Sequence, residues 1–224
     1  MHNEIKVGGN VGGNVVAGQH NVVGQPSAPP PEHAPVPEGF TPRIGFVVDM
    51  VGFGRRGAHD RDDLQHRLDH LVGLVVADLG FRQRDMESAV AGDSKVVFLP
   101  VGADSSRIVP VLVSALSERL ARDNTRYRDR MRLRMAIGTG LLGNGPLGFT
   151  GDLIVDLHRL VDSDVLRAAI AEDEAVDLAI LLTHTLHDEV LRPGFLDKTD
   201  FTRVEITMKE YTGTAWLGRY PLSA

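Results

Sequence analysis

The sequence contains no cysteine and no long apolar run. Without cysteine the chain has no disulfides, thiolate zinc sites or cysteine nucleophiles, which fits a reducing cytoplasm. The longest apolar stretches, residues 108–116 and 175–182, are far shorter than the roughly 20 residues that cross a bilayer. The N-terminus lacks a basic segment followed by an apolar core, so no secretion signal is predicted. We expect a cytoplasmic protein without a membrane partner.

An excess of positive charge is also missing. The 24 lysines and arginines are outnumbered by 30 acidic residues, which gives a net charge of -6. The locally basic segment 122–134 is interleaved with acids and half of it alternates like a strand, so we interpret it as a solvated edge. We therefore expect no nucleic-acid partner. At 224 residues and 42% hydrophobic content, the chain is long enough for one core, with an appendage.

Composition divides the chain into three parts. Residues 1–24 repeat Gly, Asn and Val, residues 25–40 are rich in proline, and residues 41–224 have the pattern of a folded domain. The proline-rich part is expected to be an extended linker, because proline lacks the backbone donor that helices and sheets need.

The Gly/Asn/Val repeat in residues 1–24 has two interpretations. Such a glycine-rich segment cannot repay its ordering entropy and is expected to be a disordered tail. Alternatively, asparagines and valines from several chains stack into ladders and dry interfaces. The repeat resembles the short bacterial amyloid signalling motifs found at the termini of immune and conflict proteins. That resemblance implies self-assembly, or templating of a partner, through residues 1–24.

The periodicity of the folded part predicts the order strand, helix, strand, strand, helix, strand, followed by a helix and further strands. Asp60 and Asp63 are candidate N-terminal caps of the first helix, and Ser105 or Ser106 of the second. The predicted strands are residues 43–50, 88–92, 95–100, 130–138, 176–183, 201–210 and 214–221; the leucine-rich stripes of residues 64–79, 108–120 and 153–161 mark the helices.

Gly52, Gly54 and Gly57 match the G-x-G-x-x-G pattern of a dinucleotide-binding turn. A dinucleotide fold requires a crossover helix after its second strand, yet here only a tight turn at Gly92 and Asp93 joins the second and third strands. This order instead predicts an α+β fold with a ferredoxin-like βαββαβ core, an antiparallel sheet with helices on one face, and additional C-terminal strands.

In such a fold the first strand is central and pairs with the third, so Asp49 and Asp93 are expected to converge. Two carboxylates suit Mg²⁺, which leaves positions open for phosphates. Gly52 and Gly54 would then let backbone amides approach a triphosphate. In the alternative interpretation, Asp49 caps a turn and Asp93 sits in a hairpin loop.

Residues 43–221 resemble the catalytic domain of the class III nucleotidyl cyclases, and more closely a divergent actinobacterial type. Five segments carry the resemblance: "VVDMVGFG", "GDSKVVFLP", "LRMAIGTG", "GDLIVDLHRLVD" and "VEITMKEYTGTAW". The family converts a nucleoside triphosphate to a 3′,5′-cyclic nucleotide and pyrophosphate.

The resemblance implies roles for individual residues. Asp49 and Asp93 would hold Mg²⁺ or Mn²⁺, Arg159 would stabilise charge developing on the α-phosphate, and Lys209 would meet the triphosphate. In this family the sites form between two head-to-tail chains. A homodimer with two sites is therefore expected, each receiving Arg159 from the partner.

Two positions depart from the family pattern. Val155 stands where a ribose-orienting asparagine is usual, and Ala89 where a purine cyclase carries a base-reading lysine. Neither side chain makes the missing hydrogen bonds. Either the base is unusual or catalysis is lost. The alternative function is a catalytically inactive nucleotide-binding or scaffold module that assembles through its N-terminal motif.

Two histidine pairs are weaker candidates for a site. His66 and His70 are spaced to clamp a metal from one helix, but no third ligand is apparent in the sequence. His184 and His187 lie near the start of a predicted short helix. We interpret both pairs as surface polar residues.

Overall fold

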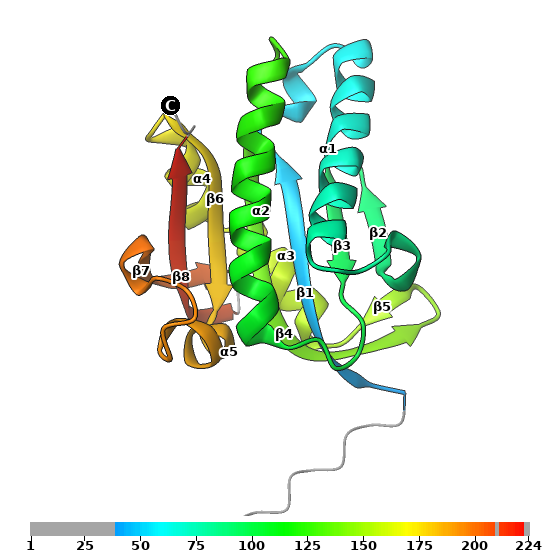
Figure 1. Ribbon diagram of the computed structural model, residues 1–224, viewed down its shortest axis with the longest axis vertical. Helices are drawn as coiled ribbons and strands as arrows, with labels where there is room; N and C mark the ends of the chain where they lie inside the picture. Colours follow the sequence, from blue (N-terminus) through cyan, green and yellow to red (C-terminus); the bar gives the residue numbers. More distant parts are fainter. Residues whose placement is uncertain (1–38, 209–210, 222–224) are drawn as a thin grey trace, which may run out of the picture. The chain divides into compact units, whose positions relative to one another are not determined.

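The computed structural model describes residues 39–208 and 211–221 (Figure 1). Predictions for the tail (1–24), for the linker up to residue 38 and for Lys209 lie outside the described residues. Within these two ranges, every helix is too short or too polar to cross a membrane.

The predicted strands and helices occur in the predicted order, and a short strand (Gly148–Thr150) and a helix (Asp164–Ala171) that were not predicted are added to them. The strands are β1 (Thr41–Met50), β2 (Glu87–Ala91), β3 (Ser94–Phe98), β4 (Leu133–Gly145), β5 (Gly148–Thr150), β6 (Val176–Thr183), β7 (Phe201–Met208) and β8 (Tyr211–Pro221). The α-helices are α1 (Ala58–Asp78), α2 (Ser105–Arg126), α3 (Asp152–Val161), α4 (Asp164–Ala171) and α5 (His184–Leu186). A 3₁₀ turn (Phe53–Arg55) links β1 to α1, and a π-helical turn (His187–Leu191) follows α5.

The strands form one sheet in the order β2-β3-β1-β4-β6-β8-β7, with β5 paired to β4. β1 is antiparallel to both of its neighbours, β3 and β4. The predicted central position of the first strand beside the third is therefore confirmed. The sheet is mixed rather than purely antiparallel, because β4 and β6 run parallel.

Helices cover both faces of the sheet, so the expectation of helices on one face is wrong. Phe46 and Val48 of β1 pack in the core beneath α1 and α2, whereas Val47 packs with Leu157 of α3 on the opposite face. Figure 1 shows α1 and α2 in front of the sheet and α3 behind it. The cause is the uninterrupted apolar run of β1, which is buried on both sides rather than alternating.

The predicted helix caps are also wrong. α1 begins after Gly57, without a capping side chain, and Asp60 lies in its first turn. α2 is capped by Asp104, whose carboxylate accepts from the Ser106 backbone N–H at 3.0 Å. An aspartate one position ahead of the two serines takes the capping role because aspartate is also a strong N-cap residue.

Two glycines bring α3 close to the sheet. A Cβ on Gly45 of β1 would lie 2.6 Å from a ring carbon of Phe98 and 3.1 Å from Leu157. Gly151, just before α3, has φ +120°, and a Cβ there would lie 2.4 Å from the Leu141 carbonyl oxygen. Any side chain at Gly151 would clash with backbone, so the start of α3 is fixed against β4.

Candidate functional site

The sheet topology brings Asp49 and Asp93 together. Asp49 pairs in register with Ser94, the first residue of β3. The backbone N–H of the next residue, Met50, donates to the carbonyl of Asp93 at 3.0 Å. Asp93 does sit in the hairpin turn, after Gly92 at φ +62°. The turn, however, places it beside the end of β1.

Asp49 has a close partner that the sequence analysis missed. Arg134 lies opposite it on β4, and its Nε donates to Asp49 Oδ2 at 3.0 Å. Its Nη2 donates to the same oxygen. Both side chains are largely buried. Arg134 belongs to the segment interpreted as a solvated edge. The signal that could have revealed it is the alternation in the strand predicted over residues 130–138, which puts Arg132 and Arg134 on the same side.

The ion pair does not fully compensate Asp49. Burial raises the pKa of its carboxyl above the ordinary value of 3.8, and the charges of Asp93 and Asp162 raise it further. Arg134 works in the opposite direction, by charge and by hydrogen bonding. A carboxylate that remains costly to ionise beside an arginine is typical of functional sites.

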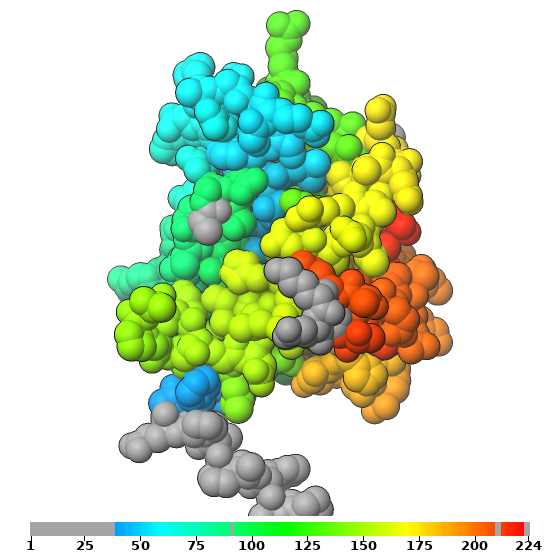
Figure 2. All heavy atoms as spheres, turned by 180° about the vertical axis from the view of Figure 1, so that it is seen from behind, coloured from blue at the N-terminus to red at the C-terminus, as the bar shows by residue number. Residues whose placement is uncertain are grey.

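A cleft of about 560 Å³ opens next to this pair. Its walls come from the loop after β1, from β4 and from α4, and they include Arg55, Arg132, Arg134 and Arg167 against a single acid, Glu174. Figure 2 shows the end of β1 (blue) between the β2–β3 hairpin (green) and α4 (yellow). Such a volume and charge suit an anionic small ligand.

The four arginines are not equivalent. Arg132 donates to the carbonyls of Ile170, Asp173 and Val176, so its guanidinium closes the C-terminal end of α4. Arg167 makes an exposed ion pair with Asp162 at 3.0 Å, a contact of little strength in water. Arg55 is exposed in the loop after β1. Arg55 and Arg167 are therefore the arginines most accessible to an anion in the cleft, whereas Arg134 already gives Nε and Nη2 to Asp49 and would have to exchange that partner for the anion.

The glycines of this loop differ in position. Gly52 lines the cleft in a left-handed conformation, with φ +71°. Gly54 lies in the 3₁₀ turn and is exposed. Arg56 fixes the conformation of this loop. Its Nη1 donates to the Val51 carbonyl at 3.0 Å, and its Nε and Nη2 donate to the Asp129 carboxylate.

The other predicted site residues lie elsewhere. Arg159, on α3, contacts Asp156 at 3.4 Å and is partly exposed, as is Val155. Burial raises the pKa of Asp156, and Arg159 opposes that shift. Ala89 is exposed on β2, at the edge of the sheet. None of these three residues is among the described residues that line the cleft beside Asp49.

The two carboxylates are a chemically suitable pair for a divalent cation. In the described ranges no group of three histidine, aspartate or glutamate side chains comes together. Asp49 uses only Oδ2 for Arg134, which leaves Oδ1 available. Two carboxylates completed by substrate phosphates are the usual donors of an open Mg²⁺ site. The residues therefore fit a cation that binds together with a phosphate ligand.

The histidine pairs do not form a metal site in the described part of the chain. His66 lies 3.9 Å from Asp62, and both side chains are strongly exposed. His184 and His187 instead stack near Trp216, with ring centroids at 5.4 and 4.0 Å. His187 is only partly exposed, because its ring packs against the indole of Trp216. It is therefore less of a surface residue than the sequence suggested.

Several solved structures with a similar fold are nucleotidyl cyclase domains. No protein-family model and no curated protein matches the sequence. An adenylate/guanylate cyclase/hydrolase from Silicibacter pomeroyi is 16% identical, with a TM-score of 0.59 over 82% of this chain and 99% of that one. The guanylyl cyclase Cya2 is 14% identical (TM-score 0.57; 80% and 91%).

A third structure is the guanylate cyclase domain of RhGC from Catenaria anguillulae in complex with GTP, 14% identical with a TM-score of 0.53 over 80% and 97% of the two chains. Identities this low establish the fold alone. The chain has the fold of the class III adenylate and guanylate cyclase catalytic domains.

Proposed function

We propose that this protein is a metal-dependent nucleotidyl cyclase that converts a nucleoside triphosphate to a 3′,5′-cyclic nucleotide and pyrophosphate. In this reaction the 3′ oxygen bonds to the α-phosphorus, the bond from that phosphorus to the bridging oxygen breaks, and the hydroxyl proton is released. The observation that carries the proposal is that the end of β1 and the β2–β3 turn bring Asp49 and Asp93 together on a cyclase fold, while Arg134, the partner of Asp49, lines an arginine-rich cleft.

The cleft residues have separate tasks in this proposal. Arg134, Arg55 and Arg167 bind the phosphates through charge-assisted hydrogen bonds, and Gly52 lets the chain approach them without a side chain in the way. Asp49 and Asp93 hold Mg²⁺ or Mn²⁺. When bound, the cation neutralises phosphate charge and lowers the pKa of the attacking hydroxyl.

The Asp49–Arg134 ion pair couples the binding of the triphosphate to the binding of the cation. A triphosphate carries more negative charge than one carboxylate and competes for the guanidinium of Arg134. Once Arg134 turns to the phosphates, both oxygens of Asp49 are available to the cation. Triphosphate and cation are therefore expected to bind with positive coupling.

The remaining groups are supplied by a homodimer. Arg159 lies outside the cleft of its own chain and is partly exposed, which is consistent with its reaching the site of a head-to-tail partner. There it would stabilise charge developing on the α-phosphate. Lys209 would contact the triphosphate.

The second candidate is a catalytically inactive nucleotide-binding or scaffold module. Two observations favour it: Val155 presents an apolar, 44% exposed side chain on α3, and Asp49 is already engaged in an ion pair with Arg134. In this candidate, residues 1–24 assemble the chain or template a partner. In either case, we place the protein in bacterial signalling or defence.

An assay of the full chain with the four ribonucleoside triphosphates and Mn²⁺ distinguishes the candidates. A cyclic product that falls about a hundredfold or more in Asp49→Asn and Asp93→Asn supports the cyclase. Asp85→Asn, an exposed acid distant from β1 in the sequence, is the matched control and should retain activity. Nucleotide binding by calorimetry without any cyclic product would reject the enzyme and favour the scaffold.

A further inference from the structure

A second pocket lies between α1 and α2, on the face of the sheet opposite to α4. Its volume is about 310 Å³, at the small end of the range of ligand pockets. Leu71 and Leu74 of α1 are among its apolar lining residues, and α2 contributes Arg119, Arg122 and Arg126. We call it the α1–α2 pocket.

The lining of the α1–α2 pocket is positive although the chain is negative. Four arginines face two aspartates there, while the whole chain carries -6. Two of the arginines are committed: Arg67 bonds to Asp123 at 2.6 Å, and Arg119 bonds to both carboxylate oxygens of Asp78. The positive excess therefore resides mainly on the other two.

Arg122 and Arg126 are the available cations. They are one helical turn apart on α2, so their guanidinium groups can converge on one ligand. Arg122 contacts Glu118 at 3.3 Å, but both side chains are strongly exposed and such pairs add little stability. Arg126 lies over the Tyr127 ring and forms no ion pair with the residues that the structure describes.

We propose that the α1–α2 pocket binds a small organic phosphate. The phosphate group lies between Arg122 and Arg126, since two guanidinium forks match its oxygens. The carbon part of the ligand rests on Leu71 and Leu74. The pocket is too small for a folded partner, and its apolar lining favours an organic phosphate over a bare ion.

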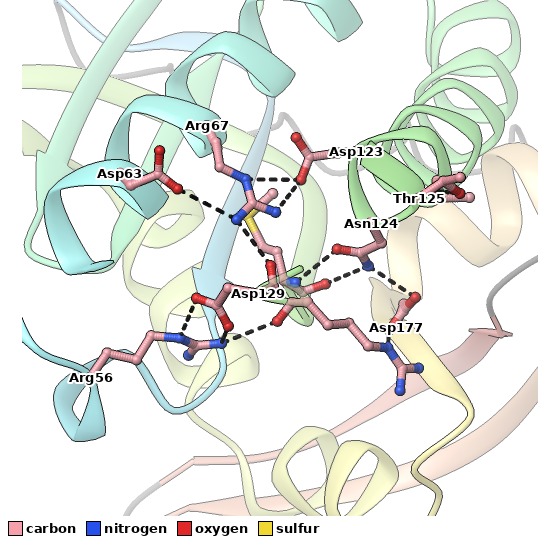
Figure 3. A network of polar contacts seen from close by, with 11 residues as sticks. Arg56, Asp63, Arg67, Asp123, Asn124, Thr125, Asp129 and Asp177 are labelled. Carbon is pink, nitrogen blue, oxygen red and sulfur yellow. Dashed lines mark hydrogen bonds and ion pairs between the residues drawn. The ribbon is translucent and has the colours of Figure 1, made fainter. Parts of the chain in front are cut away.

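Contacts across the molecule connect this pocket to the loop after β1 (Figure 3). Arg67 lines the pocket, and its Nη1 donates to the Asp129 carbonyl at 3.0 Å. The Asp129 carboxylate accepts from Arg56, which in turn donates to the Val51 carbonyl at 3.0 Å. Arg67 thus belongs both to the pocket wall and to the hydrogen-bond network that fixes the loop beside Asp49, and a ligand packed against Arg67 is expected to stabilise that network. The site serves as a regulatory one.

Titration of the full chain with phenyl phosphate, followed by calorimetry, tests the binding. We expect binding that is weakened about tenfold or more in R122E/R126E. The charge-matched control R84E/R107E, which changes exposed arginines outside the pocket, should bind within about twofold of the unchanged protein. Inorganic phosphate should bind about tenfold more weakly, because it makes no contact with the leucines. Equal binding by R122E/R126E and the control, or equal binding of both phosphates, would overturn the proposal.

The same titration separates this pocket from the cleft. R134Q removes a cleft arginine and should leave phenyl phosphate binding unchanged, whether or not the protein is a cyclase. Loss of binding in R134Q would assign the ligand to the cleft and reject the pocket. A second measurement does not depend on the folding of R122E/R126E. His70 lines the pocket, and its ring signals in NMR spectra can be assigned by comparison with H70N. These signals should shift when the unchanged protein is titrated with phenyl phosphate. Unchanged His70 signals contradict the proposal.

Hydrogen exchange tests the connection to the loop. Phenyl phosphate should slow exchange in residues 51–57. R56Q should abolish that slowing while its affinity for phenyl phosphate stays within about twofold, because Arg56 does not line the pocket. Exchange that is unchanged by the ligand, or slowed equally in R56Q, rules out the regulatory connection.

Discussion

Two arginines of this protein, one buried and one largely buried, bind carboxylates in different ways. Arg67, 4% exposed at its side chain, donates to Asp123 and to the Asp129 carbonyl, and Asp63 lies 3.6 Å away. Arg134 directs two donors to a single oxygen of Asp49, and the carboxyl pKa remains raised by burial. Arg67 joins α1, α2 and the loop before β4, whereas Arg134 borders an open cleft.

The difference separates an ion pair that holds the fold from one that a ligand can open. A buried guanidinium with several partners leaves a large penalty when it is removed. Asp49 is different, because Arg134 only partly offsets the cost of burying its charge. A ligand that binds in the cleft can therefore replace this ion pair at a lower cost in free energy.

The largest expected effect is on stability. Arg67→Ala should lower the free energy of unfolding by about 3 kcal/mol, because it leaves Asp123 and the Asp129 carbonyl without their partner. Arg134→Ala should cost less than half as much, because the Arg134 side chain is more exposed than that of Arg67 and Asp49, once it has lost Arg134, can take up a proton. Urea denaturation measures both. A greater loss for Arg134→Ala than for Arg67→Ala would reverse the comparison.

The next effect is on ligand binding. Arg134→Gln should weaken binding of a nonhydrolysable nucleoside triphosphate by about tenfold or more, because a charge-assisted bond to phosphate is lost. Arg107→Gln, at an exposed position on α2, is the control and should leave the affinity unchanged. Isothermal titration in the presence of Mg²⁺ measures both. If the two variants bind alike, Arg134 has only a structural role.

A smaller effect concerns protonation of Asp49. Its pKa is raised above 3.8, so the folded state binds this proton more tightly than the unfolded chain does. The stability that the group contributes is fully present below about pH 3.8 and is lost as pH rises through the raised pKa.

Arg134→Gln should raise the Asp49 pKa further, because it removes the causes that lower it. Carboxyl carbon shifts followed by NMR across pH 3 to about 8 report the titration. An Asp49 pKa at or below 3.8, or one that falls in Arg134→Gln, would contradict this account.

The smallest effect is expected for an exposed pair. Arg119 and Asp78 form a bidentate contact between α2 and α1. The hydrogen bond from Arg119 lowers the pKa of Asp78 below its ordinary value, because it stabilises the ionised carboxylate. A double-mutant cycle with Arg119→Gln and Asp78→Asn should give a coupling of about 0.2–1 kcal/mol after solvent screening. A coupling energy as large as the loss of stability in Arg67→Ala would show that solvent exposure does not make the Arg119–Asp78 pair weaker than the buried contacts of Arg67.

Part of the site could be predicted from sequence because it depends on topology. A tight turn at Gly92 and Asp93 implies a hairpin, and the split arrangement then places Asp93 beside the end of the first strand. Arg134 was missed because its position depends on the register between β1 and β4, which no local pattern specifies. The partition of β1 between two helical layers was missed although its continuous apolar run indicated it.

Other errors were local. Asp104 caps α2 in place of the neighbouring serines because several adjacent residues had suitable chemistry and backbone geometry decides among them. The roles of Arg159, Lys209 and residues 1–24 depend on a partner chain or on residues outside the described part. They stay predictions.

Gly151 limits how this protein can diversify. Because no side chain fits between its backbone and the Leu141 carbonyl, the axis of α3 is pinned at one end. Substitutions on the outward surface of α3, at Val155 for example, can alter which chemical group is presented without tilting the helix. The fold thereby separates the choice of recognition chemistry from the mechanical positioning of the element that displays it.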